Sequence, residues 1–283
     1  MEIIQKKIIT PALICRYESH LQEQEKSAAT IEKYVRNLNA AADFQGAELD
    51  RPLLIAWKEQ LSARYAVSSV NGILAAVNGL FAFCDWGELK VKPLKKQREL
   101  FCAENRELTR DEYIRLVQAA KENGNERLSL VLQTICGTGI RVSELRCITA
   151  EAVRMGRAEV NGKGKRRTVF LPQKLCQLLS KYLKRQRRTT GPVFVTKNGR
   201  PLNRSNIWRD MKALCDSANV EPGKVFPHNL RHLFARTYYA MEKDLSRLAD
   251  LLGHSNVNTT RIYTVESGAV HARQVERMGL VIT

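Results

Sequence analysis

From position 141 onward, this chain of 283 residues holds a spaced set of arginine, histidine and tyrosine residues. Arg141 comes first, His228 and Arg231 follow, then His254, and Tyr263 comes last. Breaking a phosphodiester without a metal requires neutralised phosphate oxygens, a nucleophile in line and a proton for the leaving oxygen. An arginine fork matches phosphate geometry and stays charged. A tyrosine becomes a workable nucleophile once positive charge favours its phenolate. These residue types therefore indicate metal-free cleavage of a phosphodiester.

The missing proton donor in that scheme is expected to be a lysine. A lysine beside other cations can have its pKa lowered enough to serve as a general acid. The segment 162–165, Gly-Lys-Gly-Lys, offers Lys163 and Lys165. Residue spacing alone leaves the choice between them open.

A zinc site is the alternative use of the histidines. His228 and Arg231 lie three apart, on one face of a helix if Pro227 opens it. His232 lies four after His228, and His-x-x-x-His is half of a metalloprotease motif. The residue after His228 is Asn229, where that motif has its glutamate base. We therefore predict no metal ligands, and no cofactor.

Tyr263 also has a simpler interpretation. Leucines at helical spacing end at Gly253, which suits a helix C-cap, and His254 follows at once. A lone tyrosine nine residues later is more often a core residue than a nucleophile. The catalytic interpretation of Tyr263 thus depends on its companions.

The elements that position these residues are expected to form two domains. Over 1–87, apolar residues at helical spacing predict four short helices, and Ser27 is a plausible cap for the second. Residues 88–106 lose that spacing around Pro93 and predict a basic linker. Lys92 and Lys95 of this linker are expected to contact phosphates, although a connector without a ligand would look the same.

Residues 107–283 are predicted to form the second domain. Thr109 and Glu112 match a capping box at its first helix. Residues 157–171 read as strand, glycine-bearing turn and strand, and 193–195 as a further short strand. The remainder reads as helices. The predicted fold class is mainly α with a small β-sheet in this domain.

Charge is distributed unevenly over the chain. Residues 1–87 hold 9 Lys/Arg and 10 Asp/Glu, whereas residues 88–283 hold 37 and 19, a net charge of +18. Such concentration favours a polyanionic partner, most commonly nucleic acid, over a merely solvated basic face. Seven scattered cysteines without a Cys-x-x-Cys pair, no long apolar run and no secretory signal predict a cytoplasmic protein.

Three motifs in this order resemble the tyrosine recombinase (integrase) family. Residues 138–145 look like its first arginine box, 228–231 like its His-x-x-Arg box, and 252–264 like its terminal Gly-His to Tyr box. The resemblance extends over roughly 105–270, and each box alone is weak. The length of the chain resembles the simple Xer-like and integron-type members more than larger integrases. The resemblance to the family implies a two-domain DNA clamp, whose amino-terminal part is a SAM-like core-binding domain.

The resemblance also implies a role for each matched residue. Arg141 and Arg231 would clamp the scissile phosphate, and His254 would donate a further hydrogen bond to it. Tyr263 would attack to give a 3′-phosphotyrosyl link that stores the bond energy without ATP. His228 would assist proton transfer, and Lys163 would protonate the leaving 5′ oxygen. Glu144 is expected to orient Arg141 or a neighbour.

Further DNA contacts and partners are less closely tied to motifs. Lys165, Arg166 and Arg167 flank the predicted hairpin and are expected near the cleavage point. Arg204 and Arg209 lie on a helix that would reach a groove or remain solvated. By resemblance, the substrate is double-stranded DNA with inverted-repeat core sites, in or near the nucleoid. The carboxyl-terminal tail would link protomers into a tetramer, unless it packs on its own domain, and an accessory protein would set direction.

The rivals share parts of this scheme. A type IB topoisomerase has the same chemistry but rejoins the same strand. A DNA-binding protein without catalysis would retain the charge, although all six active positions are filled here.

Overall fold

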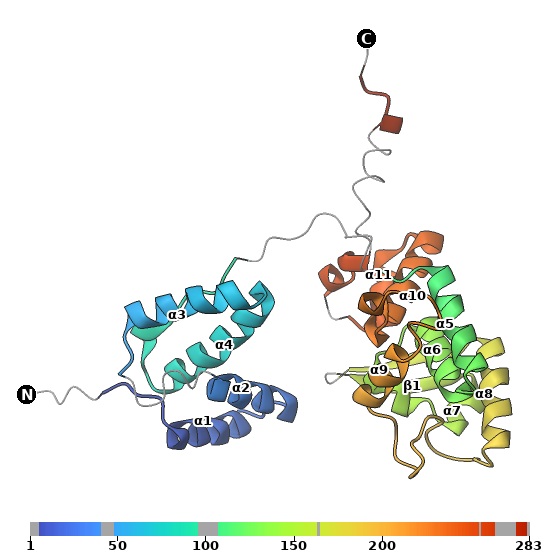
Figure 1. Ribbon diagram of the computed structural model, residues 1–283, viewed down its shortest axis with the longest axis horizontal. Helices are drawn as coiled ribbons and strands as arrows, with labels where there is room; N and C mark the ends of the chain where they lie inside the picture. The colour runs from blue at the N-terminus through green and yellow to red at the C-terminus, as the bar shows by residue number, and fades with distance from the viewer. Residues whose placement is uncertain are drawn as a thin grey trace, which may run out of the picture. The chain divides into compact units, whose positions relative to one another are not determined.

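The computed structural model describes residues 6–40, 48–95, 107–162, 165–254, 256–263 and 276–281, with the backbone alone at Lys165. The chain divides into two compact units, Met1–Arg98 and Glu99–Thr283. Each unit has its own apolar core. The boundary between the units falls inside the linker predicted at 88–106. Figure 1 shows the two units, and the described elements are helices apart from one two-stranded sheet, which confirms the predicted fold class.

The first unit is the predicted set of four helices. Thr10 and Asp50 cap two of them, each accepting a hydrogen bond from a backbone N–H three residues later. The fourth helix contacts the other three, so the core forms around it. The helices are α1 (Pro11–Glu23), α2 (Ala28–Ala40), α3 (Arg51–Arg64) and α4 (Val67–Phe83).

Two asparagines of α4 fix the chain that follows this unit. The Asn78 amide exchanges two hydrogen bonds with the backbone of Val91, at 2.8 and 3.0 Å. Asn71 does the same with Leu94, at 2.9 and 2.8 Å. Val91 is buried, as is Leu89 in the 3₁₀ helix η2 (Gly87–Leu89). The described beginning of the predicted linker is therefore packed on the first unit.

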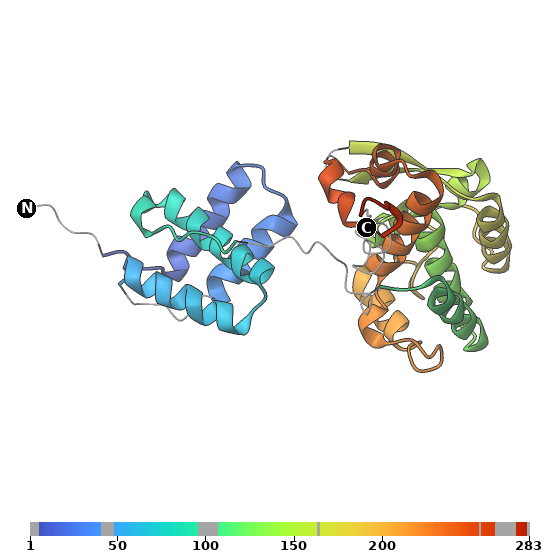
Figure 2. The same cartoon turned by 90° about the horizontal axis from the view of Figure 1, so that it is seen from above.

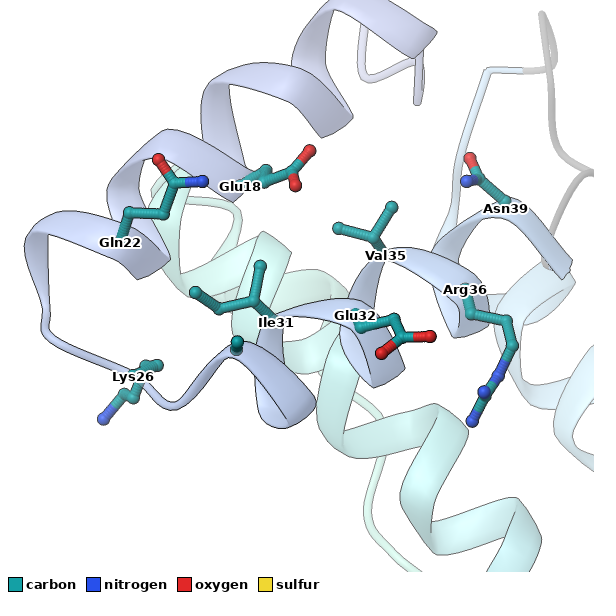
Figure 3. A pocket seen from close by; sticks show the side chains of 9 residues that line it. Glu18, Gln22, Lys26, Ile31, Glu32, Val35, Arg36 and Asn39 are labelled. Carbon is teal, nitrogen blue, oxygen red and sulfur yellow. The ribbon is translucent and has the colours of Figure 1, made fainter. Parts of the chain in front are cut away.

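An open groove of about 750 Å³ lies between α1 and α2. Ile31 and Val35 form its apolar floor, and Glu18 faces them from α1 (Figure 3). Acidic and basic side chains line it in equal number, so it carries no excess charge that would favour a polyanion. The charged lining residues are Glu18, Lys26, Glu32 and Arg36.

The second unit surrounds one buried helix, α6 (Glu126–Thr138), which contacts α5, α8, α9 and α10. Thr109 and Glu112 form the predicted capping box, with hydrogen bonds of 3.2 and 2.7 Å. The other elements are α5 (Arg110–Glu122), η4 (Val142–Cys147), α7 (Ala150–Met155), β1 (Arg157–Gly162), β2 (Lys165–Phe170), α8 (Gln173–Arg185), α9 (Arg204–Lys212), η5 (Pro222–Lys224), α10 (Pro227–Glu242), α11 (Leu245–Leu252), η6 (Val257–Thr259) and η7 (Arg261–Tyr263).

The predicted hairpin is present and the predicted third strand is not. β1 and β2 pair antiparallel, from Arg157 with Phe170 to Gly162 with Lys165. Within residues 193–195 only Val195 makes a bridge, an isolated one with Pro201. The prediction of a strand there was wrong, because buried Val193 and Phe194 pack in the core without a neighbouring ladder to join. In Figure 2 the yellow-green hairpin lies beside the orange helices near the end of the chain.

No helix within the described ranges is long and apolar enough to cross a membrane.

Candidate active site

Arg231 is the centre of the candidate site. It lies on α10, which Pro227 opens as predicted, and it is the largest fully buried side chain among the described residues. Its Nη1 donates to the carbonyl of Gly139 at 2.6 Å, and its Nη2 donates to the carbonyl of Leu252 at 2.7 Å. Those carbonyls end α6 and α11, where helix dipoles concentrate negative charge. Two helix ends thus hold the arginine.

Gly139 permits this arrangement because of its conformation and its neighbour. Its φ of 65° lies in the left-handed region, where a side chain is strained. A Cβ at this position would stand 2.4 Å from Cδ1 of Phe234 on α10. The close approach of α6 to α10 therefore requires glycine.

His254 follows Gly253, the left-handed C-cap of α11, and turns toward Arg231. Its Nε2 lies 3.0 Å from Nη2 of Arg231, and its Nδ1 lies 2.9 Å from the Thr260 hydroxyl. An arginine only donates, so we assign Nε2 as acceptor and place the proton on Nδ1. Burial, then Arg231 and Arg141, lower the pKa of His254 to about 4. In this arrangement Nε2 accepts, so the expected donation to a phosphate requires the ring or its proton to move.

Tyr263 combines the two interpretations that its sequence position allowed. Its ring is buried against Ala235, Leu248 and Leu252. It also stacks on His254, with ring centroids 5.9 Å apart. Burial and Arg141 lower the pKa of Arg231 to about 10, and Tyr263 opposes that change. The tyrosine is therefore a packed residue that stacks on His254 and lies near enough to Arg231 to affect its pKa.

Two histidines of α10 extend the site on the other side of that ring. His232 stands edge-on to Tyr263, with centroids 4.6 Å apart, and His228 stands edge-on to His232 at 4.5 Å. Burial, followed by His228 and Arg231, lowers the pKa of His232 to about 4. His228 reaches the surface, and partial burial with Arg231, Arg141 and Arg204 lowers its pKa. Both shifts favour the neutral form of the ring.

Arg141 approaches the same place from η4. Its Nη1 donates to Oε1 of Glu144 at 3.1 Å, and its Nη2 lies 3.5 Å from the carbonyl of Gly253. The side chain is 38% exposed, in contrast to buried Arg231. Glu144 thus orients Arg141, as expected from their spacing.

The remaining predicted residues are placed unevenly. Lys163 lies outside the described residues, and the side chain of Lys165 is not described, so the choice of general acid stays a prediction. Arg166 is exposed on β2, and Arg204 and Arg209 are exposed on α9. Lys92 and Lys95 are exposed on the first unit.

Trp208 is a residue that the sequence analysis missed. It lies four after Arg204 on α9 and is 49% exposed, and Lys212 lies over its ring at 5.4 Å. An exposed tryptophan among cations is typical of a binding surface. The signal was available, since Ile207 and Met211 mark the opposite, buried face of the same helix.

Among the side chains that the structure describes, no three His, Cys, Asp or Glu residues gather as a metal site would need.

Comparisons with known proteins agree with the motifs. The model of the phage integrase family matches residues 106–268. The tyrosine recombinase XerD of Xanthomonas campestris pv. campestris is 32% identical over 295 positions, covering 90% of this chain and 88% of its own. The tyrosine recombinase XerA of Pyrococcus furiosus is 28% identical over 288 positions, covering 98% of both chains.

Solved structures show the same fold. A lambda integrase dimer bound to a COC′ core site superposes with a TM-score of 0.72 at 18% identity, covering 89% of this chain and 76% of that one. The XerH site-specific recombinase bound to its difH substrate, a pre-cleavage complex, superposes with a TM-score of 0.68 at 18% identity, covering 95% and 89%.

Proposed function

This chain belongs to the phage integrase family of tyrosine recombinases, and we propose that Tyr263 is the residue through which it cuts and rejoins DNA. Membership makes it a tyrosine-type site-specific recombinase. The observation that carries the proposal is the stacking of the Tyr263 ring on His254, whose Nε2 lies 3.0 Å from Nη2 of buried Arg231. A phenol and a guanidinium in one site supply the nucleophile and the charge that offsets the phosphate.

The proposed reaction begins with a phosphate bound between Arg141 and Arg231. Arg231 is preorganised by two carbonyls, so little reorganisation is needed when charge develops in the transition state. The phenol oxygen attacks phosphorus, the bond to the 5′ oxygen breaks, and a 3′-phosphotyrosyl link forms. Lys163 supplies the proton to the 5′ oxygen, and neutral His228 accepts or shares the phenol proton.

Basic residues outside this centre are proposed to hold the duplex. Arg204 lies close enough to His228 to lower its pKa, so the beginning of α9 borders the site. Arg209 and Trp208 continue the exposed face of that helix. Arg166 and Lys165 would contact the backbone beside the hairpin. Lys92 and Lys95 would do so from the core-binding unit at 1–87 and its linker.

The assembly is proposed from the relatives. XerH and lambda integrase are described in complexes with DNA, and lambda integrase also as a tetramer on a Holliday junction. We expect this chain to act as a tetramer on inverted-repeat core sites, with an accessory protein setting direction. The tail that would link protomers includes residues 264–275, which lie outside the described residues. Cytoplasmic action on nucleoid DNA follows from the same proposal.

The test is covalent trapping on a nicked suicide substrate made from DNA that flanks the gene. The wild type should form an adduct that survives denaturation, whereas Tyr263→Phe should bind the DNA and form none. Tyr238→Phe, which alters a neighbouring ring of the same apolar cluster, should react normally. An adduct from Tyr263→Phe would remove this residue from its role.

The same substrates separate the rivals. Exchange of strands between two DNA molecules is the expected product of the wild type. Relaxation of supercoils without exchange would favour a type IB topoisomerase, and DNA binding without any adduct would favour a silent binding protein.

A further inference from the structure

One cation of the hairpin points inward. Arg167 on β2 pairs both Nη atoms with the two carboxylate oxygens of Glu144, each at 2.8 Å. Its Nε donates to the carbonyl of Leu251 on α11 at 3.1 Å. The side chain is only 13% exposed. Arg167 therefore joins the hairpin, η4 and the end of α11, and has no free edge for DNA in this arrangement.

Glu144 is saturated by two arginines. Its Oε1 accepts from Arg141 and Arg167, and its Oε2 accepts from the backbone N–H of Arg141 and from Arg167. Four hydrogen bonds fill the acceptor sites of a carboxylate. Burial raises the pKa of Glu144, but the bonds from Arg167 and Arg141 outweigh it, so the pKa lies below its ordinary value.

The geometry divides these two arginines by task. Arg167 offers Glu144 a complete two-pronged pair, whereas Arg141 offers one Nη and keeps the rest of its fork exposed. The cluster consists of Arg141, Arg231, Arg167 and the carboxylate of Glu144, so it has two net positive charges. Without Arg167 it would keep one, and a buried carboxylate would stand next to the exposed fork.

We propose that Arg167 is a positioning residue that occupies Glu144 and thereby leaves Arg141 free to hold the scissile phosphate. The proposal rests on the function proposed above and adds a residue to it. When Arg167 is removed, Glu144 should draw the second Nη of Arg141 toward itself, because an unpaired buried carboxylate is costly. Arg141 would then be turned away from the phosphate.

Gly253 has a matching role in this arrangement. A Cβ on it would stand 2.8 Å from Cδ of Arg167 and 3.0 Å from its Nη1. The absence of a side chain at the end of α11 is therefore what lets Arg167 pass to Glu144.

The experiment uses the full chain in single-turnover cleavage of the suicide substrate, with DNA affinity measured separately. Arg167→Met should cleave about 100-fold more slowly, since small displacements of a catalytic group cost this much, while its affinity for DNA stays close to that of the wild type. Arg167→Met combined with Glu144→Gln should recover on the order of tenfold, because no carboxylate competes for Arg141. Arg115→Met is the control: it removes an arginine of the same unit that also bonds the main chain, at the carbonyls of Ala218 and Asn219, and it should cleave normally.

A second substrate tests the route through Arg141. A methylphosphonate at the scissile position carries no charge and needs less of Arg141, so the defect of Arg167→Met should shrink to a few-fold. A purely structural ion pair would leave the defect equal on both substrates, which would overturn the proposal. So would a double variant slower than Arg167→Met.

The wild type separates this proposal from the function on which it rests. A wild type that forms no adduct refutes the proposed function and the positioning role together. A wild type that cleaves while Arg167→Met cleaves equally fast refutes the positioning role alone.

Discussion

Replacing Gly139 by alanine should lower the free energy of unfolding more than the same change at a glycine of similar conformation that has open space around it. The backbone at Gly139 has φ 65°, and a left-handed alanine costs about 1–2 kcal/mol. Its Cβ would also lie 2.4 and 2.6 Å from Cδ1 and Cε1 of Phe234. That ring stacks on Tyr238, so it cannot simply swing aside, and such overpacking costs about 1–3 kcal/mol. The total expected is about 2–5 kcal/mol.

Gly156 is the matched control for this change. It ends α7 with φ 68°, and a Cβ there meets no atom within 4 Å. Gly156→Ala should therefore cost only the conformational part, about 1–2 kcal/mol. Any gain from a less flexible unfolded chain is common to both alanines and cancels in the comparison.

Hydrogen exchange under rising urea, followed on peptides of α6 and α10, gives the unfolding free energy of the second unit by itself. In a Phe234→Ala background, Gly139→Ala should cost no more than Gly156→Ala does. Equal costs for the two glycines in the wild-type background, or the same cost for Gly139→Ala with and without the ring, would refute the steric reasoning. Cleavage by Gly139→Ala should fall as well, because the carbonyl of Gly139 holds Arg231.

Two further predictions concern pH and salt. The pKa values of His232 and His254 are lowered to about 4 in the folded protein. On acidification the unfolded chain therefore binds protons before the folded protein does. The free energy of unfolding should fall as the pH drops from about 6.5 toward 4. His232→Phe keeps an aromatic ring against Tyr263 and should flatten this fall between about pH 7 and 5 in the same exchange measurement; an unchanged slope would contradict the assigned pKa. For DNA affinity, a plot of log K against log salt should lose about 0.9 from its slope in Arg204→Ala, one phosphate contact fewer. Arg154→Ala, whose side chain already bonds the carbonyl of Thr189, should keep the wild-type slope, and an unchanged slope in Arg204→Ala would show that it contacts no phosphate.

Local signals explain what the sequence could predict. Thr109 and Glu112 are three apart, which is the spacing of a capping box, and the glycines at 162 and 164 indicate a hairpin turn. The gathering of Arg231, His254 and Tyr263 was expected from the family resemblance, since spacing along a chain does not bring segments together in space.

Contacts between distant segments explain what the sequence could not predict. Arg167 reads as one of three consecutive basic residues, and only the pairing of β2 with η4 and α11 shows that it faces Glu144. Asn71 and Asn78 read as polar residues of a helix, and their pairing with the chain at 91 and 94 depends on tertiary packing. The strand expected at 193–195 shows the same limit, because a buried apolar run carries no sign of whether a partner strand exists.

Arg167 and Arg231 both donate hydrogen bonds to main-chain oxygens, at positions 139, 251 and 252. A change of side chain at those positions does not remove these hydrogen bonds, because every amino acid has the same main-chain carbonyl. A deep mutational scan should therefore find Leu251 more permissive than its location suggests, and should find intolerance at the neighbouring glycines, where the path of the chain itself is set. In this enzyme the path of the backbone therefore fixes where these two positive charges lie.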